Sequence, residues 1–209
     1  MDLQDVVAEI TRRFDSRSSA GRQWNDPHEH SDVADEEYSR VSEPERYAVV
    51  GARAMSWVDA LEGLQLATAH HVEAPSWTYG PADARAVLVT PIETDALSIL
   101  VVMGSMEGIE DAVVALGVGD PAVLIGIEPF CGCDACDSGS DGLLTAIDDM
   151  FTGIVDGGFL YAEGEDWTLT VGVNGWSASG SQDFDSLIDK ARSGTSIGHR
   201  MIIGGPWLT

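Results

Sequence analysis

Hydrophobic residues recur at intervals of three and four positions in four stretches of the chain, a spacing that predicts amphipathic helices. The first apolar stripe is made by Leu3, Val6, Val7, Ile10 and Phe14. The second stretch opens with an N-cap serine, Ser42, a first-turn proline, Pro44, and a capping-box glutamate, Glu45. The predicted helices span residues 2–15, 42–62, 140–156 and 183–192.

Short runs rich in valine, leucine and isoleucine lie between these helices and predict strands. Two neighbouring runs, 84–91 and 96–103, have the pattern of an antiparallel pair. Near the end of the chain, residues 167–173 alternate between apolar and polar side chains, and Asn174-Gly175 then gives a two-residue hairpin signal. The predicted strands cover residues 64–72, 84–91, 96–103, 112–116, 122–127, 159–163 and 167–173.

Strands outnumber helices and follow one another through short connections, which favours antiparallel pairing. We therefore expect an α+β fold with a mostly antiparallel sheet flanked by helices. Residues 16–37 lose periodicity and are rich in Ser, Asp, His and Gly, as in a long loop. The expected organisation is an N-terminal helix with a mobile loop, residues 1–40, and a single α+β domain, residues 41–209. Whether the first helix packs on that domain is left open.

Charge narrows the possible partners. Asp and Glu total 35 against 11 Lys and Arg, and the formal net charge is −24 at pH 7. Phosphate binding needs clustered cations, so we expect neither a nucleic acid nor an anionic membrane as partner. The negative electrostatic field of the protein would attract basic proteins and metal cations. The simpler interpretation is that the acidic residues only form a solvated surface.

The three cysteines lie within six positions, which is unlike the disulfide framework of a secreted protein. The first residues lack the basic start and apolar core of a signal peptide, and no apolar run is long enough to span a bilayer. These features predict a protein of the reducing cytoplasm.

The cysteine segment carries the candidate chemistry. Cys133 and Cys136 have the C-x-x-C spacing that aims two sulfurs at one point, and Gly132 lets the backbone bend so that Cys131 can supply a third. Thiolates suit zinc, which takes four ligands in a tetrahedron. The predicted zinc ligands are Cys131, Cys133, Cys136 and Asp137. Alternative fourth ligands are His70 or His71, then Asp134 nearby and the remote His28, His30 and His199.

Other interpretations of this segment stay open. The thiols are inert if they only fill space, and Cys133 and Cys136 could form a reversible disulfide, although no thioredoxin-like βαβ pattern surrounds them. A calcium loop is a further alternative, with Asp137, Asp141, Gly142 and Asp148 at template positions one, five, six and twelve. Position three is a glycine, which has no ligand side chain.

The chain resembles an uncharacterised family of acidic actinobacterial proteins in four features. These are the run Cys131-Gly132-Cys133-Asp134-Ala135-Cys136-Asp137, the amphipathic helix from Ser140, the strand–turn meander and the closing Pro206-Trp207. The resemblance covers most of the chain beyond the first forty residues, and the cysteine segment is its specific element. It implies a source class and no activity.

No nucleophile elbow, P-loop or dinucleotide fingerprint is present in the sequence. Four tryptophans fall in predicted loops or ends, where such residues either anchor partners or seal core edges. We therefore expect a non-catalytic binding or regulatory protein, of the immunity type, that acts on a basic protein and carries a structural zinc. The alternative is a metal-dependent enzyme in which a cysteine-bound zinc keeps an open position.

Overall fold

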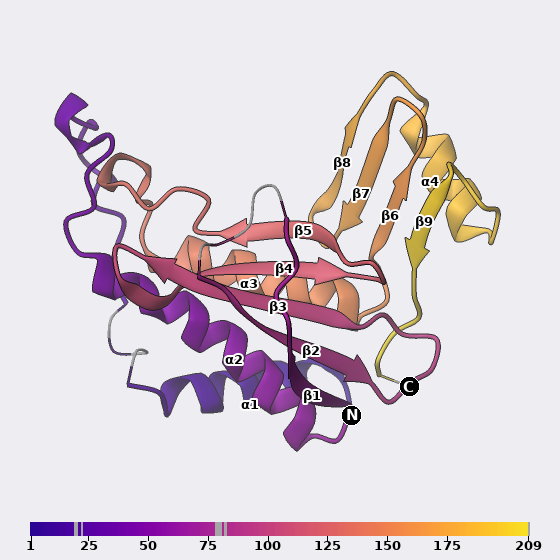
Figure 1. Cartoon of the computed structure of the whole chain (residues 1–209), viewed down its shortest axis with the longest axis horizontal. Coiled ribbons are helices and arrows are strands. Elements are labelled where there is room, and N and C mark those ends of the chain that lie inside the picture. Colours follow the sequence, from indigo (N-terminus) through magenta and orange to yellow (C-terminus); the bar gives the residue numbers. More distant parts are fainter. Residues whose placement is uncertain (19–20, 22, 78–80, 82, 209) are drawn as a thin grey trace.

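The computed structural model describes residues 1–18, 21, 23–77, 81 and 83–208. Over this part of the chain, nine strands form two antiparallel sheets, and four α-helices accompany them (Figure 1). The α+β prediction is confirmed. The strands divide between two sheets of five and four strands, a division that the sequence pattern did not predict.

The larger sheet is a meander in which each strand pairs with the next along the chain. Its strands are β1 (Ala67–Val72), β2 (Arg85–Pro91), β3 (Ile99–Met106), β4 (Ile109–Val118) and β5 (Val123–Glu128). The predicted strand 112–116 is the middle of the longer β4, and residues 64–66 of the first predicted strand lie before β1 begins. Because side chains alternate between faces, Val87, Val101 and Leu116 stand beside one another across the sheet on the buried face.

Helices cover that face of the larger sheet. α2 (Ala48–Gly63) and α3 (Ser140–Val155) contact the sheet and each other, and α1 (Leu3–Asp15) packs on α2 (Figure 1). The rings of Trp57 on α2 and Phe151 on α3 stack with their centroids 5.0 Å apart. Val6, Ile10 and Phe14 are buried in the same core, so the first helix does pack on the rest of the protein. None of the described helices has the length and apolar composition needed to cross a bilayer.

The second predicted helix begins later than its capping pattern indicates. Pro44–Tyr47 forms a 3₁₀ turn, and the α-helix starts at Ala48. Ser42 does not cap the helix, because its Oγ donates to Asp134 Oδ2 at 2.6 Å. A hydrogen bond to an ionised carboxylate is stronger than one from a backbone amide to a neutral hydroxyl, so the tertiary contact prevails over the local one.

The smaller sheet has the strand order β8-β7-β6-β9 and stands beyond one end of the larger sheet (Figure 1). Its strands are β6 (Leu160–Glu163), β7 (Thr168–Gly172), β8 (Gly175–Ser179) and β9 (Arg200–Ile203), and α4 (Phe184–Arg192) packs on one face. The predictions at 159–163 and 167–173 are confirmed, whereas β8 and β9 were missed. β8 is exposed throughout and β9 has four residues, so neither shows an apolar alternation that a pattern search would detect.

The close approach of α2 to β4 generates a testable prediction. Alanine in place of a helical glycine normally stabilises a helix by about 1 kcal/mol. A Cβ on Gly51, however, would lie 2.4 Å from the backbone oxygen of Asp111. We expect Gly51→Ala to lower the free energy of unfolding by roughly 1–3 kcal/mol, measured by urea denaturation.

Gly142 of α3 supplies the matched control, since the nearest atom to its added Cβ would be Ser138 Oγ at 3.6 Å. Gly142→Ala should leave stability unchanged or raise it. Stabilisation by both alanines would show that α2 and β4 are not in this tight contact.

Candidate metal centre

The cysteine loop joins the end of β5 to the start of α3. Its C-x-x-C portion folds into a 3₁₀ turn, Asp134–Cys136, in which the Cys136 amide donates to the Cys133 carbonyl at 3.0 Å. Gly132 passes so close to Met106 that an added Cβ would lie 2.1 Å from the methionine sulfur. A side chain at position 132 would therefore require the Met106 side chain to move.

The turn brings the three sulfur atoms together, as the sequence predicts. The Sγ atoms of Cys131, Cys133 and Cys136 all lie within 4.8 Å of one another. Cys131 Sγ is 3.3 Å from Cys133 Sγ. Cys133 is buried, whereas Cys131 and Cys136 are exposed, so the cluster opens to solvent on one side. Three convergent thiols of this kind can bind a soft or borderline cation.

The thiols do not ionise alike. Hydrogen bonds from the thiol groups of Cys131 and Cys136 and from the backbone near Ser39 favour a thiolate at Cys133 and lower its pKa to about 7. The same neighbouring sulfurs raise the pKa of Cys136 to about 11, because a second negative charge would form beside the first. A bound cation would remove this repulsion and allow all three sulfurs to be thiolates.

Asp134 anchors the middle of the cysteine loop. Its carboxylate accepts hydrogen bonds from the Ser42 backbone at 2.9 Å, from Ser42 Oγ at 2.6 Å and from Arg40 Nε at 2.7 Å. Its own amide donates to the Arg40 carbonyl at 2.7 Å. These partners, Ser42 and then Arg40, hold the pKa of Asp134 down at about 2. The carboxylate is therefore ionised and fully occupied.

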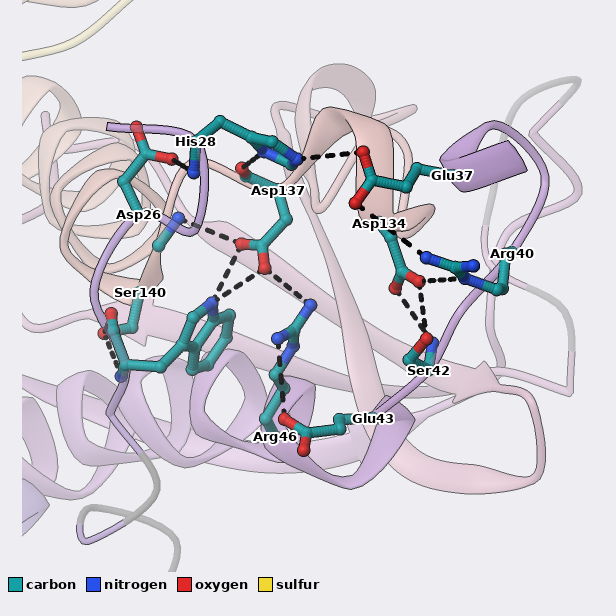
Figure 2. Close-up of polar contacts among 12 residues, drawn as sticks. Asp26, His28, Glu37, Arg40, Ser42, Glu43, Arg46, Asp134, Asp137 and Ser140 are labelled. Atoms are coloured by element: carbon teal, nitrogen blue, oxygen red, sulfur yellow. Dashed lines mark hydrogen bonds and ion pairs between the residues drawn. The ribbon is translucent and has the colours of Figure 1, made fainter. Parts of the chain in front are cut away.

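Asp137 forms a second anchor at the end of the loop (Figure 2). Its carboxylate is 2.5 Å from Arg46 and accepts from Trp24 Nε1 at 2.8 Å and from the Gly139 amide at 2.9 Å. Only 1% of the Asp137 side chain and 15% of the Arg46 side chain are exposed, so this ion pair is desolvated. The Arg46 guanidinium also lies over the Trp24 ring, 4.8 Å from its centroid.

Further contacts fix the segment that precedes α2 against the loop. The Trp24 amide donates a hydrogen bond of 3.1 Å to Ser140 Oγ, and the Ser140 amide donates one of 3.0 Å to the Trp24 carbonyl. His28 bridges the two segments through the Asp137 carbonyl at 3.2 Å and Glu37 Oε2 at 3.3 Å, and these two contacts raise its pKa (Figure 2). Residues 24–46 thus wrap the cysteine loop.

Comparison with known proteins shows which family the chain belongs to. The model of a family of unknown function, DUF6226, matches residues 11–209. The chain belongs to this family. No curated protein and no solved structure is detectably similar to it. The match confirms the resemblance to an uncharacterised family, and its span includes both the cysteine loop and the segment that wraps it.

The fourth zinc ligand does not emerge from the geometry. Among the described residues, the group that could hold a metal ion contains the three cysteines and neither a carboxylate nor an imidazole. The carboxylate of Asp137 is taken up by Arg46 and Trp24, and that of Asp134 by Arg40 and Ser42. The predicted assignment of Asp137 as ligand therefore has no support from its contacts.

Of the histidines named as alternatives, His28 reaches the loop but its ring contacts the Asp137 carbonyl and Glu37, and the other four lie elsewhere. His70 and His71 are on β1, at the opposite edge of the sheet from β5, which leads into the cysteine loop. His30 is exposed, and His199 lies 3.4 Å from Glu163 in the smaller sheet. The calcium-loop alternative also loses a ligand, because Asp148 pairs with Arg53 at 2.7 Å.

Sequence reasoning missed the residues that position the loop. Trp24, Arg40 and Arg46 lie about a hundred positions before their partners, and only Trp24 falls in the stretch 16–37 that lacks hydrophobic periodicity. No local pattern marks them. The one available signal is the small number of cationic residues in the chain. Because they are few, an arginine close to a buried helix is a candidate partner for a buried acid.

The Asp137 anchor leads to a stability prediction. Removing one partner of a buried ion pair leaves the other charge uncompensated, which destabilises proteins by about 3–5 kcal/mol. We expect Asp137→Asn to approach this loss in the free energy of unfolding and to make residues 24–46 sensitive to limited proteolysis. Asp141→Asn, on the exposed first turn of α3, should change stability by less than about 1 kcal/mol. Equal effects of the two substitutions would mean that the buried contact does not hold the loop.

Proposed function

We propose that this protein is a non-catalytic binding protein that holds one zinc ion, or a cation of similar softness, on Cys131, Cys133 and Cys136. The observation that carries the proposal is the convergence of three sulfur atoms within 4.8 Å. Zinc is the natural occupant, because thiolates prefer soft or borderline cations over calcium or magnesium. The net charge of −24 would also raise the local concentration of cations.

The role of the metal in this proposal is structural. Asp134 and Asp137 already fix the loop at two points, and of the sulfurs before and between them Cys131 and Cys136 are exposed whereas Cys133 is buried. A cation would bind these sulfurs to one another and make the exposed tip of the loop rigid. With three sulfurs from the chain, the fourth position of a tetrahedron falls to water or to a donor atom of a partner.

A metal-dependent enzyme is the competing proposal, since catalytic zinc sites also have three protein ligands and one open position. Two observations favour binding over catalysis. Both carboxylates of the loop are bound by arginines and cannot serve as a free general base. Five cavities in the described part of the chain, of about 120 to 480 Å³, are lined by residues other than the cysteines.

The partner in this proposal is a basic protein in a reducing, cytoplasmic environment. Most arginines of the chain are engaged with its own acids, as in the pairs of Arg17 with Asp59, Arg53 with Asp148 and Arg85 with Asp111. The remaining acidic groups outnumber the cations by a wide margin and lie largely on the surface. Such a field speeds association with a cationic protein and weakens as salt is added, which is the behaviour of a regulator of the immunity type.

Metal content tests the first part of the proposal. Protein purified without added metal, then dialysed against zinc and against zinc-free buffer, should retain about one zinc per chain by elemental analysis. Cys133→Ser and Cys136→Ser should lose it, because two thiolates bind zinc far more weakly than three.

Ser138→Ala is the matched control, because Ser138 is exposed in the same loop and contributes no sulfur. This variant should keep its zinc. Native protein that never retains a metal, or serine variants that retain as much as the wild type, would contradict the proposal. Zinc that is present together with turnover of a hydrolysable substrate would instead favour the enzyme.

Salt dependence tests the second part. We expect immobilised protein to retain a small set of basic proteins at low ionic strength and to release them when ionic strength shortens the Debye length to about 3 Å at 1 M salt. A polyglutamate resin carried through the same steps shows which proteins bind to negative charge alone. If every protein retained at low salt also binds that resin, no specific basic partner exists.

A further inference from the structure

A cleft of about 320 Å³ lies between the β7–β8 hairpin and the helix α3, with β5 at its base. Figure 1 shows the hairpin standing at the end of the larger sheet, above α3. Ile125, Met150 and Phe159 give the cleft apolar walls, and Thr170 and Ser177 add two hydroxyl groups from the hairpin. Its size falls at the lower end of the roughly 300–1,000 Å³ range of small-molecule sites.

Small residues keep the cleft open. Gly172 and Gly175 line it from the hairpin, and a Cβ at either position would meet no atom within 4 Å. Met150 lies over Gly126 of β5, where a Cβ would come 2.4 Å from the methionine sulfur, so this flexible side chain is seated in the floor. Trp176 also borders the cleft, but its ring lies 5.6 Å from that of Phe184, on the face of the sheet that packs on α4. The walls therefore suit a compact apolar or aromatic group.

One carboxylate in the cleft has no cation beside it. Asp149 accepts a hydrogen bond of 2.6 Å from Asn174 Nδ2, and among the described residues no arginine, lysine or histidine pairs with it. Five other partly covered aspartates, Asp59, Asp111, Asp134, Asp137 and Asp148, each pair with an arginine, and Asp26 accepts a hydrogen bond from the His28 amide. A carboxylate accepts more than one hydrogen bond, so Asp149 retains free acceptor positions.

We propose that this cleft binds a small organic cation with an apolar or aromatic body. Its ammonium group would pair with the Asp149 carboxylate, and its body would lie against Met150, Phe159 and Ile125. An anionic ligand of the same shape would meet both the unpaired carboxylate and the net charge of −24.

This site is separate from the cysteine cluster. It shares no residue with the loop 131–137, and its lining comes from α3, β5, the β7–β8 hairpin and Phe159, which directly precedes β6. Zinc content and binding in the cleft can therefore succeed or fail independently.

The test uses a matched pair of probes on the full chain. 2-Phenylethylamine, which is cationic at neutral pH, is titrated into ¹⁵N-labelled protein, and 3-phenylpropionate serves as the anion of similar size. We expect saturable shifts of the Thr170, Gly175 and Ser177 amides with the amine, and none with the carboxylate. Absence of saturable amine binding to the wild type, or equal binding of both probes, overturns the proposal without any variant.

Two substitutions then separate the site from the overall field. Asp149→Asn should weaken amine binding roughly tenfold or more, because a charge-assisted hydrogen bond is lost. Asp156→Asn removes the same charge from an exposed position at the end of α3, outside the cleft, and should change affinity by less than about twofold. Equal weakening by both would show that the amine responds to net charge alone and would overturn the assignment to the cleft.

Discussion

Two buried aspartates determine the geometry of the cysteine loop. Asp134 binds Arg40 and Ser42, and Asp137 binds Arg46 and Trp24, so both carboxylates hold the loop against a segment about a hundred residues earlier in the chain. The three sulfurs lie before and between these anchors. Because a desolvated charge without a partner is strongly unfavourable, the loop and its wrapping segment must fold together. The candidate metal site is therefore a product of long-range ionic contacts.

The positions of the few cationic residues determine which acids are paired within the fold. Arginines are placed against acids that folding partly covers, including those on α2, α3 and β4. Acids on the surface need no such partner, because water screens them, and they give the protein its negative field. Asp149 is different in that it lines a cleft yet has only an amide beside it. Charge pairing within the fold thus separates structural acids from those available to other molecules.

Local sequence patterns were reliable where one face of an element is buried and the other exposed. The stripe Leu3–Phe14 and the valine-rich run of β2 lie in the structure where the sequence predicts them, since hydrophobic burial is the dominant local signal. β3 overlaps the predicted strand 96–103 but begins and ends three residues later. The patterns failed where burial is weak or where a tertiary contact competes. β8 is exposed along its length, and Ser42 binds a distant carboxylate instead of capping its own helix.

The sequence by itself determined the α+β composition, the acidic charge and the local turn that brings Cys133 and Cys136 together, because each depends on residue type or on spacing over a few positions. Only the tertiary structure decided that the strands form two sheets and that α1 joins the main core. It also decided that Asp137 faces an arginine and that Asp149 remains without a cation. These features depend on which distant segments meet, and the energy of a buried charge or an apolar contact is realised only once they do.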